Sequence, residues 1–183
     1  PIPSRTSDEK VETMNIFYID KDPVQAAQWM VDKHVVKMIL ESAQLLSTAH
    51  RLLDGREIEG KSKTGRKARR WVLGDSREPV LYSATHINHP SAVWARSTRD
   101  NYIWLYRLWY YLCKEYTFRY GKTHACERLL EALYVPPLNM VKSEFFPPTP
   151  AMPDTYKVKD DSLLSYRNYY NGGKQHLATW KLR

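Results

Sequence analysis

The chain has few cysteines and no long apolar run, and each scarcity argues against a class of protein. Two cysteines, Cys113 and Cys126, in 183 residues do not make a disulfide framework, so we expect a reducing, cytoplasmic compartment. No apolar run approaches the ~20 residues that span a bilayer, and we expect no membrane partner. The chain also lacks Walker, GxGxxG and GxSxG motifs, so nothing in it indicates an NTPase, a dinucleotide enzyme or a serine hydrolase.

Aromatic residues and positive charge, by contrast, are plentiful. Six Trp and thirteen Tyr, in a sequence that is 43% hydrophobic, indicate a folded protein with a substantial core. The chain has 28 Lys and Arg against 20 Asp and Glu, a formal net charge of +8. A basic surface favours anionic partners, so nucleic acid is the expected partner. Plain solubility is the alternative interpretation of the same charge.

The order of the segments predicts a mainly α fold, a compact bundle of three or four helices with a long central helix. Residues 1–13 are polar and are interpreted as a flexible arm, and residues 14–183 as a single α-helical domain. This domain opens with a short extended, β-prone segment at 14–20, and nothing else in the sequence indicates a sheet. The segment 135–153 is rich in proline and should be extended and irregular.

Start and stop signals place the helices along the chain. Asp22 as N-cap and Pro23 at the first helical position open the first helix. The long central helix has apolar or aromatic residues on nearly every side, which is typical of a buried position. The expected helices cover residues 23–53, a short stretch from Pro90, a long stretch that ends at Gly121, 122–134 and 160–170.

Within the first helix, the stretch "DKHVVKMILES" (32–42) carries a histidine, a lysine and a glutamate at steps of three and four. His34, Lys37 and Glu41 therefore lie along one side of the helix, beside its apolar stripe. A solvated helix face is the simplest interpretation of such an edge. Apolar and small residues flank Glu41, however, which favours a cleft wall, where a partly desolvated carboxylate can hold a proton or stabilise a cation.

Basic and aromatic segments provide candidate contacts to nucleic acid. The loop 61–70 holds six Lys and Arg, and it is either a solvated linker or a segment that follows a phosphate backbone. The tail interleaves Tyr and Trp with cations, which suits unpaired or distorted bases. His89 stands at a helix start, where free N–H groups attract a phosphate. The candidate DNA-binding residues are Lys33, His34, Lys37, Arg66, Lys67, Arg69, Arg70, His89, Arg96, Arg99, Tyr166, Tyr170, Lys174, Trp180 and Lys181.

Histidines offer a second kind of site. His86 and His89, together with His124 and Cys126, have a spacing that loosely fits zinc, although the two pairs are far apart in the sequence. A simpler interpretation of Cys126 is that it is buried in an amphipathic helix. We therefore expect no metal and no cofactor, and we keep a metal-dependent enzyme built on His86, His89 and His124 as the weaker alternative.

The stretch "DKHVVKMILES", followed about fifty residues later by "NHPSAVWARSTRDNYIWLYRLWYYLCKEYTFRYG" (88–121), resembles a known family. The family is that of the pyrimidine-dimer DNA glycosylases/AP lyases, the endonuclease V of T-even phages and its bacterial relatives. It has Asp-x-His near the start of its first long helix and a catalytic glutamate seven residues after the histidine. The same steps here give Asp32, His34 and Glu41. The likeness covers roughly residues 14–121, and the family chain also closes with an aromatic, basic tail.

The resemblance implies an enzyme that excises a damaged base. Such enzymes attack the sugar C1′ of the damaged nucleotide with an N-terminal α-amine, which is partly neutral at pH 7 because its ordinary pKa lies near 8. By this resemblance Glu41 would stabilise the developing sugar cation and assist β-elimination. His34 and Lys37 would hold nearby phosphates.

The nucleophilic amine is the main point at which the chain departs from the family. Thirteen residues precede Met14, where the family start aligns. The amine would belong to Met14 if the arm is removed, or to Pro1, a secondary amine that can form an iminium, if it is kept. Lys33 and Lys37 are the substitutes. The family has arginines just before and three residues after its glutamate, where this chain has Leu40 and Gln44. The Pro-rich segment 135–153 has no obvious counterpart in the family.

We therefore expect a DNA glycosylase that acts as a monomer on double-stranded DNA with a damaged or modified pyrimidine. The sequence leaves open whether it also has AP-lyase activity. The catalytic candidates are Glu41, Met14 and Pro1. The main alternative is a non-catalytic nucleic-acid-binding domain on the same scaffold.

Overall fold

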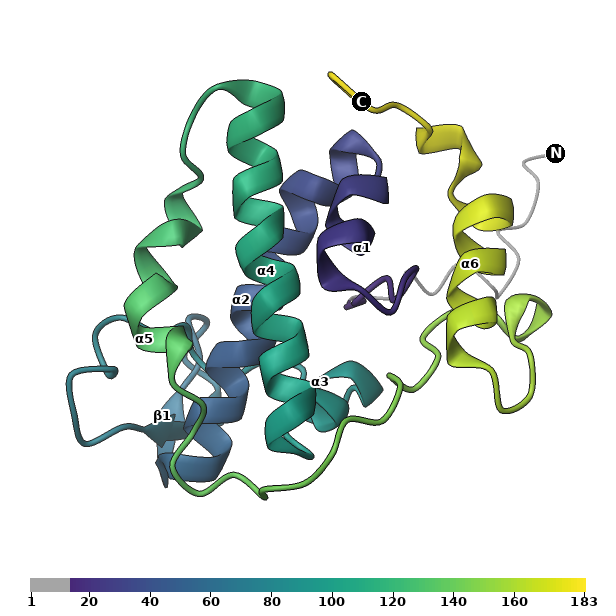
Figure 1. Cartoon of the computed structure of the whole chain (residues 1–183). Helices are drawn as coiled ribbons and strands as arrows, with labels where there is room; N and C mark the ends of the chain where they lie inside the picture. The colour runs from purple at the N-terminus through teal and green to yellow at the C-terminus, as the bar shows by residue number, and fades with distance from the viewer. Residues whose placement is uncertain (1–13) are drawn as a thin grey trace, which may run out of the picture.

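The computed structural model describes residues 14–183, and this part of the chain is mainly α-helical, as expected (Figure 1). Pro1 and the rest of the predicted arm lie outside the described residues. The helices are α1 (Pro23–Trp29), α2 (Asp32–Asp54), α3 (Pro90–Ala95), α4 (Arg99–Tyr120), α5 (Leu130–Tyr134) and α6 (Ser162–Gly173). The strands are β1 (Arg56–Lys61) and β2 (Lys67–Val72), and the short 3-10 helices are Ala125–Leu129, Asp154–Tyr156 and Gln175–Leu177.

The long helices α2 and α4 pack against each other, and α1 packs on α4 (Figure 1). α4 begins after Thr98, whose hydroxyl accepts a hydrogen bond from the Asn101 N–H at 3.1 Å. It ends at Gly121, which takes the left-handed conformation (φ 67°) that glycine adopts without strain. The aromatic side chains Tyr102 and Trp109 on its length are fully buried, so α4 supplies much of the core.

The helix predicted over 23–53 is in fact two helices, because the chain turns at Met30 and Val31. At this turn Arg119 of α4 donates to the Met30 carbonyl at 2.8 Å, and the Tyr170 hydroxyl accepts from the Val31 N–H at 2.8 Å. These bonds satisfy backbone groups that a continuous helix would have paired internally. Since the partners come from distant parts of the chain, helical periodicity could not reveal the break.

The basic loop predicted after the first long helix is a β-hairpin. β1 and β2 pair antiparallel, and diagonal ion pairs join Glu57 to Arg69 and Glu59 to Lys67 across the strands. Residues 14–20 form no strand, and they turn at Phe17, which has a φ of 54° and whose carbonyl accepts from the Ile19 N–H at 2.8 Å. The prediction about the sheet is therefore wrong in both places: the segment predicted as a basic loop forms two paired strands, and the β-prone segment at 14–20 forms none.

Residues 14–20 instead run through the core and bring the start of the described chain to α2. Ile16 and Phe17 are buried, and the Phe17 ring stacks on that of His34 with centroids 4.3 Å apart. The Asn15 side chain donates to the carbonyl of Ala151 at 2.8 Å. The fold thus fixes this segment between α2 and the Pro-rich stretch.

The remaining segments follow the sequence prediction in part. The helix expected over 122–134 starts as a 3-10 helix and continues as the short α5, and the helix expected over 160–170 is α6. The segment 135–153 has no regular structure, and Asp54 anchors it by accepting hydrogen bonds from the backbone of Leu138 and Asn139. No helix within residues 14–183 is both long and apolar enough to cross a membrane.

A candidate active site around Glu41

Glu41 lies in the middle of α2, and its carboxylate stands at the wall of a cavity of ≈ 400 Å³. The residue is 7% exposed. Its Oε2 accepts a hydrogen bond from the Asn15 backbone N–H at 3.2 Å, and its Oε1 is 3.4 Å from Lys37 Nζ. The cavity is lined by Met14, Val36, Lys37, Leu40, Glu41, Gln44, His86 and His124.

The surroundings of Glu41 favour its protonated form. Burial raises the pKa of the carboxyl above its ordinary value of 4.5, and this effect outweighs the opposing influence of Lys37, the Asn15 N–H and Lys174. A carboxyl with a raised pKa takes up and returns a proton closer to neutral pH than an exposed one does. Glu41 therefore has the environment that general acid–base chemistry requires.

The nitrogen atoms that the sequence suggested as nucleophiles lie at different distances from this carboxylate. Met14 lines the cavity, and the next backbone nitrogen, that of Asn15, contacts Glu41 directly. Lys37 is exposed, yet its ammonium forms the ion pair with Glu41. Lys33 is exposed and does not line the cavity. The structure thus brings together Met14, Lys37 and Glu41, three of the residues predicted from sequence.

His34, the first polar residue of the predicted edge, is part of the core. It is 4% exposed, and its Nδ1 lies 2.9 Å from the Tyr170 hydroxyl, which already accepts from Val31 and is placed to donate to the ring. Burial, with Lys174 and Lys37 nearby, lowers the pKa of His34 to about 4. A neutral, buried imidazole does not attract a phosphate, so the position of His34 is explained by packing.

The aromatic residues predicted to stack on bases divide into buried and exposed rings. Tyr166 and Tyr170 are buried, and the Tyr166 hydroxyl donates to the Thr149 carbonyl at 3.1 Å. Trp180 is exposed. Of the predicted aromatics, only Trp180 therefore presents a ring to solvent in the described part of the chain.

The two tail cations also differ in their surroundings. Lys174 is half-buried over the Tyr169 ring, at 4.9 Å from its centroid, and its charge acts on both His34 and Glu41. Lys181 is exposed and lies over the Tyr120 ring at 5.2 Å. Lys174 is thus the tail cation that belongs to the surroundings of the Glu41 carboxylate.

The hairpin cations lie beyond the C-terminal end of α2. Glu41 precedes the helix end at Asp54 by 13 residues, or about 20 Å of helix, and Figure 1 shows the hairpin and α6 on opposite sides of the molecule. All four predicted residues are exposed, but two of them are paired with glutamates across the strands. The predicted residues here are Arg66, Lys67, Arg69 and Arg70.

Three further candidates lie around α3 and the start of α4. His89 caps α3, because its Nδ1 accepts a hydrogen bond from the Ser91 N–H at 3.1 Å, and burial lowers its pKa. Arg96 is half-buried, and burial lowers its pKa as well. Its Nη1 has no hydrogen-bond partner within residues 14–183. Arg99 is exposed in the first turn of α4.

The histidines do not assemble as a metal site. No group of three or more His, Cys, Asp or Glu in the described range is arranged to hold a metal ion. His86 and His124 line the Glu41 cavity, whereas His89 does not. His124 also caps the 3-10 helix by accepting from the Cys126 N–H at 3.0 Å. The structure gives no support to the metal-dependent alternative, and it places two of its residues beside Glu41 instead.

Sequence reasoning missed that these two histidines share a cavity with Glu41. The relevant signal was weak, since each histidine stands in a loop far from α2 in the sequence, and only tertiary packing brings the three together. No family model matches the chain, and neither the curated proteins nor the solved structures include a significant match to it. The resemblance to the glycosylase family therefore stays a hypothesis, and the geometry of this cavity is the remaining evidence for function.

Proposed function

We propose that the protein is a DNA glycosylase with AP-lyase activity that removes a damaged or modified pyrimidine from double-stranded DNA. One observation carries the proposal: a buried carboxylate, Glu41, lies between the backbone nitrogen of Asn15 at 3.2 Å and the Lys37 Nζ at 3.4 Å, at the wall of an open cavity. A carboxylate beside an amine is the arrangement that Schiff-base chemistry at a sugar requires.

The reaction would use Glu41 at each proton transfer. The amine attacks C1′ of the deoxyribose, the bond from C1′ to the base breaks, and the base leaves with a proton. Loss of a proton from the attacking nitrogen and opening of the sugar give an iminium at C1′. Removal of a C2′ proton then expels the 3′ phosphate and cleaves the strand. The raised pKa of Glu41 suits it to accept and return these protons.

Two amines are compatible with the geometry. Lys37 Nζ is in place in the described chain, 3.4 Å from the carboxylate. Its ammonium would first give up a proton, for which Glu41 is the neighbouring acceptor, and the neutral amine would then attack. An α-amine would occupy the same region in a chain that starts at Met14 or Asn15, because the Asn15 nitrogen already contacts Glu41. The geometry supports both amines better than Lys33, which lies outside the cavity lining. Pro1 lies beyond the described residues.

DNA would approach along the polar side of α2. The net charge of +8 favours a polyanion, and Lys37 and Lys174 supply positive charge near Glu41. Exposed Arg66 and Arg70 lie at the hairpin end of the same helix. Cys113 and Cys126 are free and buried, which suits a reducing compartment such as the cytoplasm.

A non-catalytic nucleic-acid-binding domain is the second candidate, and the hairpin is the observation that favours it. A two-stranded ribbon fits the major groove of B-DNA, and the exposed cations of β1 and β2 line such a ribbon. This function would not need Glu41 or any amine. The two candidates therefore differ in whether a covalent intermediate forms.

Borohydride trapping separates the two candidates. The full chain is incubated with duplex DNA that carries either an abasic site or a pyrimidine dimer, and sodium borohydride is added to reduce the iminium to a stable amine. We expect a covalent protein–DNA adduct with one or both substrates, and peptide mapping of the adduct should identify the nucleophile. Lys37→Ala should abolish trapping if Lys37 is the nucleophile. The matched variant Lys33→Ala, one turn away on the same helix, should trap normally.

The opposite result is equally clear. Tight binding to duplex DNA without any adduct on either substrate would reject the glycosylase proposal and favour the binding domain. An adduct that maps to the N-terminal residue and survives Lys37→Ala would keep the enzyme and assign the reaction to an α-amine.

A further inference from the structure

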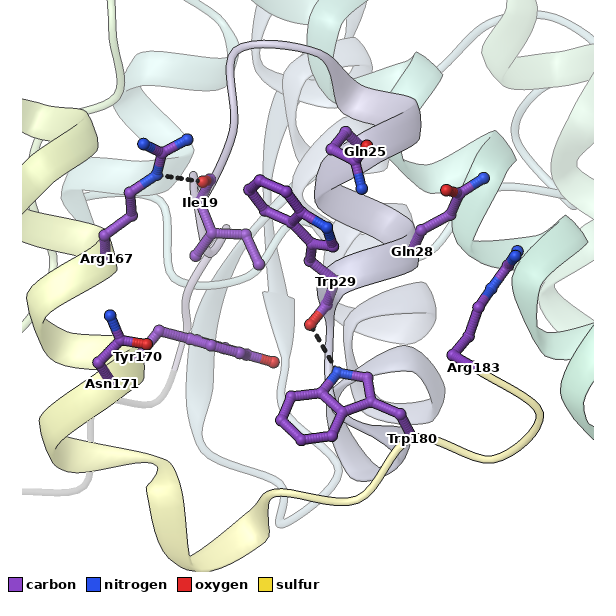
Figure 2. A pocket seen from close by; sticks show the side chains of 9 residues that line it. All are labelled: Ile19, Gln25, Gln28, Trp29, Arg167, Tyr170, Asn171, Trp180 and Arg183. Atoms are coloured by element: carbon purple, nitrogen blue, oxygen red, sulfur yellow. Dashed lines mark hydrogen bonds between the residues drawn. The ribbon is translucent and has the colours of Figure 1, made fainter.

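A second cavity, of ≈ 540 Å³, lies between α1, α6 and the C-terminal tail (Figure 2). None of its lining residues lines the Glu41 cavity. Figure 2 shows that Trp29 and two glutamines come from α1, Tyr170 and Arg167 from α6, and Trp180 and Arg183 from the tail. The size is typical of a small-molecule site, and nothing in the chemistry at Glu41 makes use of it.

Two indole rings dominate the cavity. Trp29 is 47% exposed and Trp180 is 42% exposed, which is unusual for the largest apolar side chain. The Trp180 ring is nevertheless held in place, because its Nε1 donates to the Trp29 backbone carbonyl at 2.8 Å. The Trp29 ring has the Arg167 guanidinium over it, 5.7 Å from the ring centroid. The tail is also anchored on either side of Trp180, by the bond from the Asp32 N–H to the Thr179 carbonyl and by that from the Lys181 N–H to the Asp32 carboxylate. Fixed, exposed indoles around a hollow suit a flat ring.

Amide groups face the same space. Gln25 and Gln28 of α1 and Asn171 of α6 line the cavity, and none of their side-chain amides forms a hydrogen bond within residues 14–183. Each amide offers both a donor and an acceptor. The edge of a nucleobase presents the same combination of donors and acceptors, whereas a purely hydrocarbon ring does not. The lining therefore favours a base over a plain aromatic group.

Arginines stand at the rim and are partly engaged. Arg167 donates from Nε to the Ile19 carbonyl and from Nη2 to Asp20, and Arg183 donates from Nε and Nη2 to Glu115. These bonds hold both guanidinium groups in place and leave each Nη1 without a partner in the described part of the chain. Oriented guanidinium donors are well suited to a phosphate.

We propose that this cavity binds a nucleotide, with the base against Trp29 and Trp180 and the phosphate at Arg167 or Arg183. The ligand is a nucleoside monophosphate, supplied free or as the end of a single strand. The proposal is independent of the glycosylase function, because it uses neither Glu41 nor an amine, and either can fail without the other.

The test is calorimetric titration of the full chain with AMP, GMP, CMP and UMP, and with ribose 5-phosphate as the probe that lacks a base. We expect saturable binding of at least one nucleotide and much weaker binding of ribose 5-phosphate. Trp29→Ala and Trp180→Ala should each weaken the nucleotide about tenfold or more, as loss of one stacking ring does. Trp71→Ala, which removes a half-buried indole from β2 outside the cavity, should leave the affinity unchanged.

A short single-stranded oligonucleotide that ends in the preferred base distinguishes the two sources. Tighter binding than the mononucleotide assigns a strand end, and equal or weaker binding assigns the free nucleotide. Circular dichroism establishes that each variant is folded, and Trp180→Phe, which keeps a ring, should recover most of the affinity lost in Trp180→Ala. The proposal is overturned if no nucleotide binds at millimolar concentration, if ribose 5-phosphate binds as well as the nucleotides, or if folded Trp29→Ala and Trp180→Ala bind normally.

Discussion

Two buried glutamates lie on the two long helices, and their pKa values shift in opposite directions. Glu41 on α2 is 7% exposed and Glu115 on α4 is 4% exposed. Burial raises the pKa of both. At Glu115, however, hydrogen bonds from Arg183 and Arg119 lower it below 4.5, whereas at Glu41 the influence of Lys37 is too weak to offset burial. Burial alone therefore does not decide which carboxylate is available for chemistry.

The difference lies in the number and geometry of the cations. Glu115 accepts from Arg119 at 2.8 Å and from Arg183 at 2.9 and 2.8 Å, so its charge is fully compensated. Glu41 has one lysine at 3.4 Å and a backbone N–H at 3.2 Å, and it borders a cavity. Glu115 is thus a structural anion that fastens the tail to α4. Glu41 has a raised pKa and borders open space.

The largest effect on stability is expected where the compensated cluster is broken. Arg119→Met keeps the side-chain length but leaves the carboxylates of Glu115 and Asp32 and the Met30 carbonyl without their buried donor. We expect a loss of about 3–5 kcal/mol in the free energy of unfolding, as for other broken buried ion pairs. Urea denaturation followed by circular dichroism measures it. The matched change Lys114→Met on the same helix removes a half-exposed lysine from its pair with Glu127 and should cost less, about 1 kcal/mol.

A loss for Arg119→Met no larger than that for Lys114→Met would contradict the structural role of the cluster. It would also remove the explanation for the turn between α1 and α2, which rests on Arg119 donating to the last carbonyls of α1.

A smaller effect should distinguish the two glutamates by pH. The folded-state pKa of Glu115 is lowered, so its carboxylate contributes stability above pH 4.5 that is lost as the pH falls through the folded pKa. The folded-state pKa of Glu41 is raised, so ionisation costs stability as the pH rises from 4.5 through the folded pKa. At pH 7, Glu115→Gln should therefore lose about 1.5–3 kcal/mol, and Glu41→Gln should change by less than about 1 kcal/mol, toward greater stability.

Urea denaturation of both variants and of the wild type from pH 7 down to the lowest pH at which the wild type still folds checks these signs, because the Glu115 contribution is lost below pH 4.5. The deficit of Glu115→Gln should shrink toward low pH, and Glu41→Gln should gain on the wild type as the pH rises. Parallel curves for the two variants would mean that the two carboxylates have the same environment.

The structural features that the sequence predicted correctly are those marked by residues at the feature itself. Asp22 with Pro23 and Gly121 mark helix ends through their own side chains or backbone, and these predictions are confirmed. The turn at Met30 was missed because Arg119 and Tyr170, which stabilise it, are distant in the sequence. The hairpin was missed because cross-strand charge pairs resemble a solvated charge run until the strands are in register.

The residues of the candidate site also include some that helical spacing placed correctly and one that it did not. The 3-and-4 spacing placed Lys37 and Glu41 on one face, and the structure pairs them at 3.4 Å. The same spacing placed His34 beside them, but its ring turns into the core to meet Phe17 and Tyr170. Spacing determines the angular position of a residue on a helix, while the packing partners determine whether its side chain faces a cavity or the core.

The most direct test of the account compares Glu41→Gln and Glu115→Gln in single-turnover cleavage of duplex DNA that carries an abasic site. Each rate is divided by the folded fraction, and DNA affinity is measured in parallel. We expect Glu41→Gln to bind DNA normally, to be at least as stable as the wild type and to cleave at least about 100-fold more slowly. Glu115→Gln should be less stable and should cleave at the wild-type rate per folded molecule. Wild-type cleavage by folded Glu41→Gln would contradict the assignment of Glu41 as the central carboxylate.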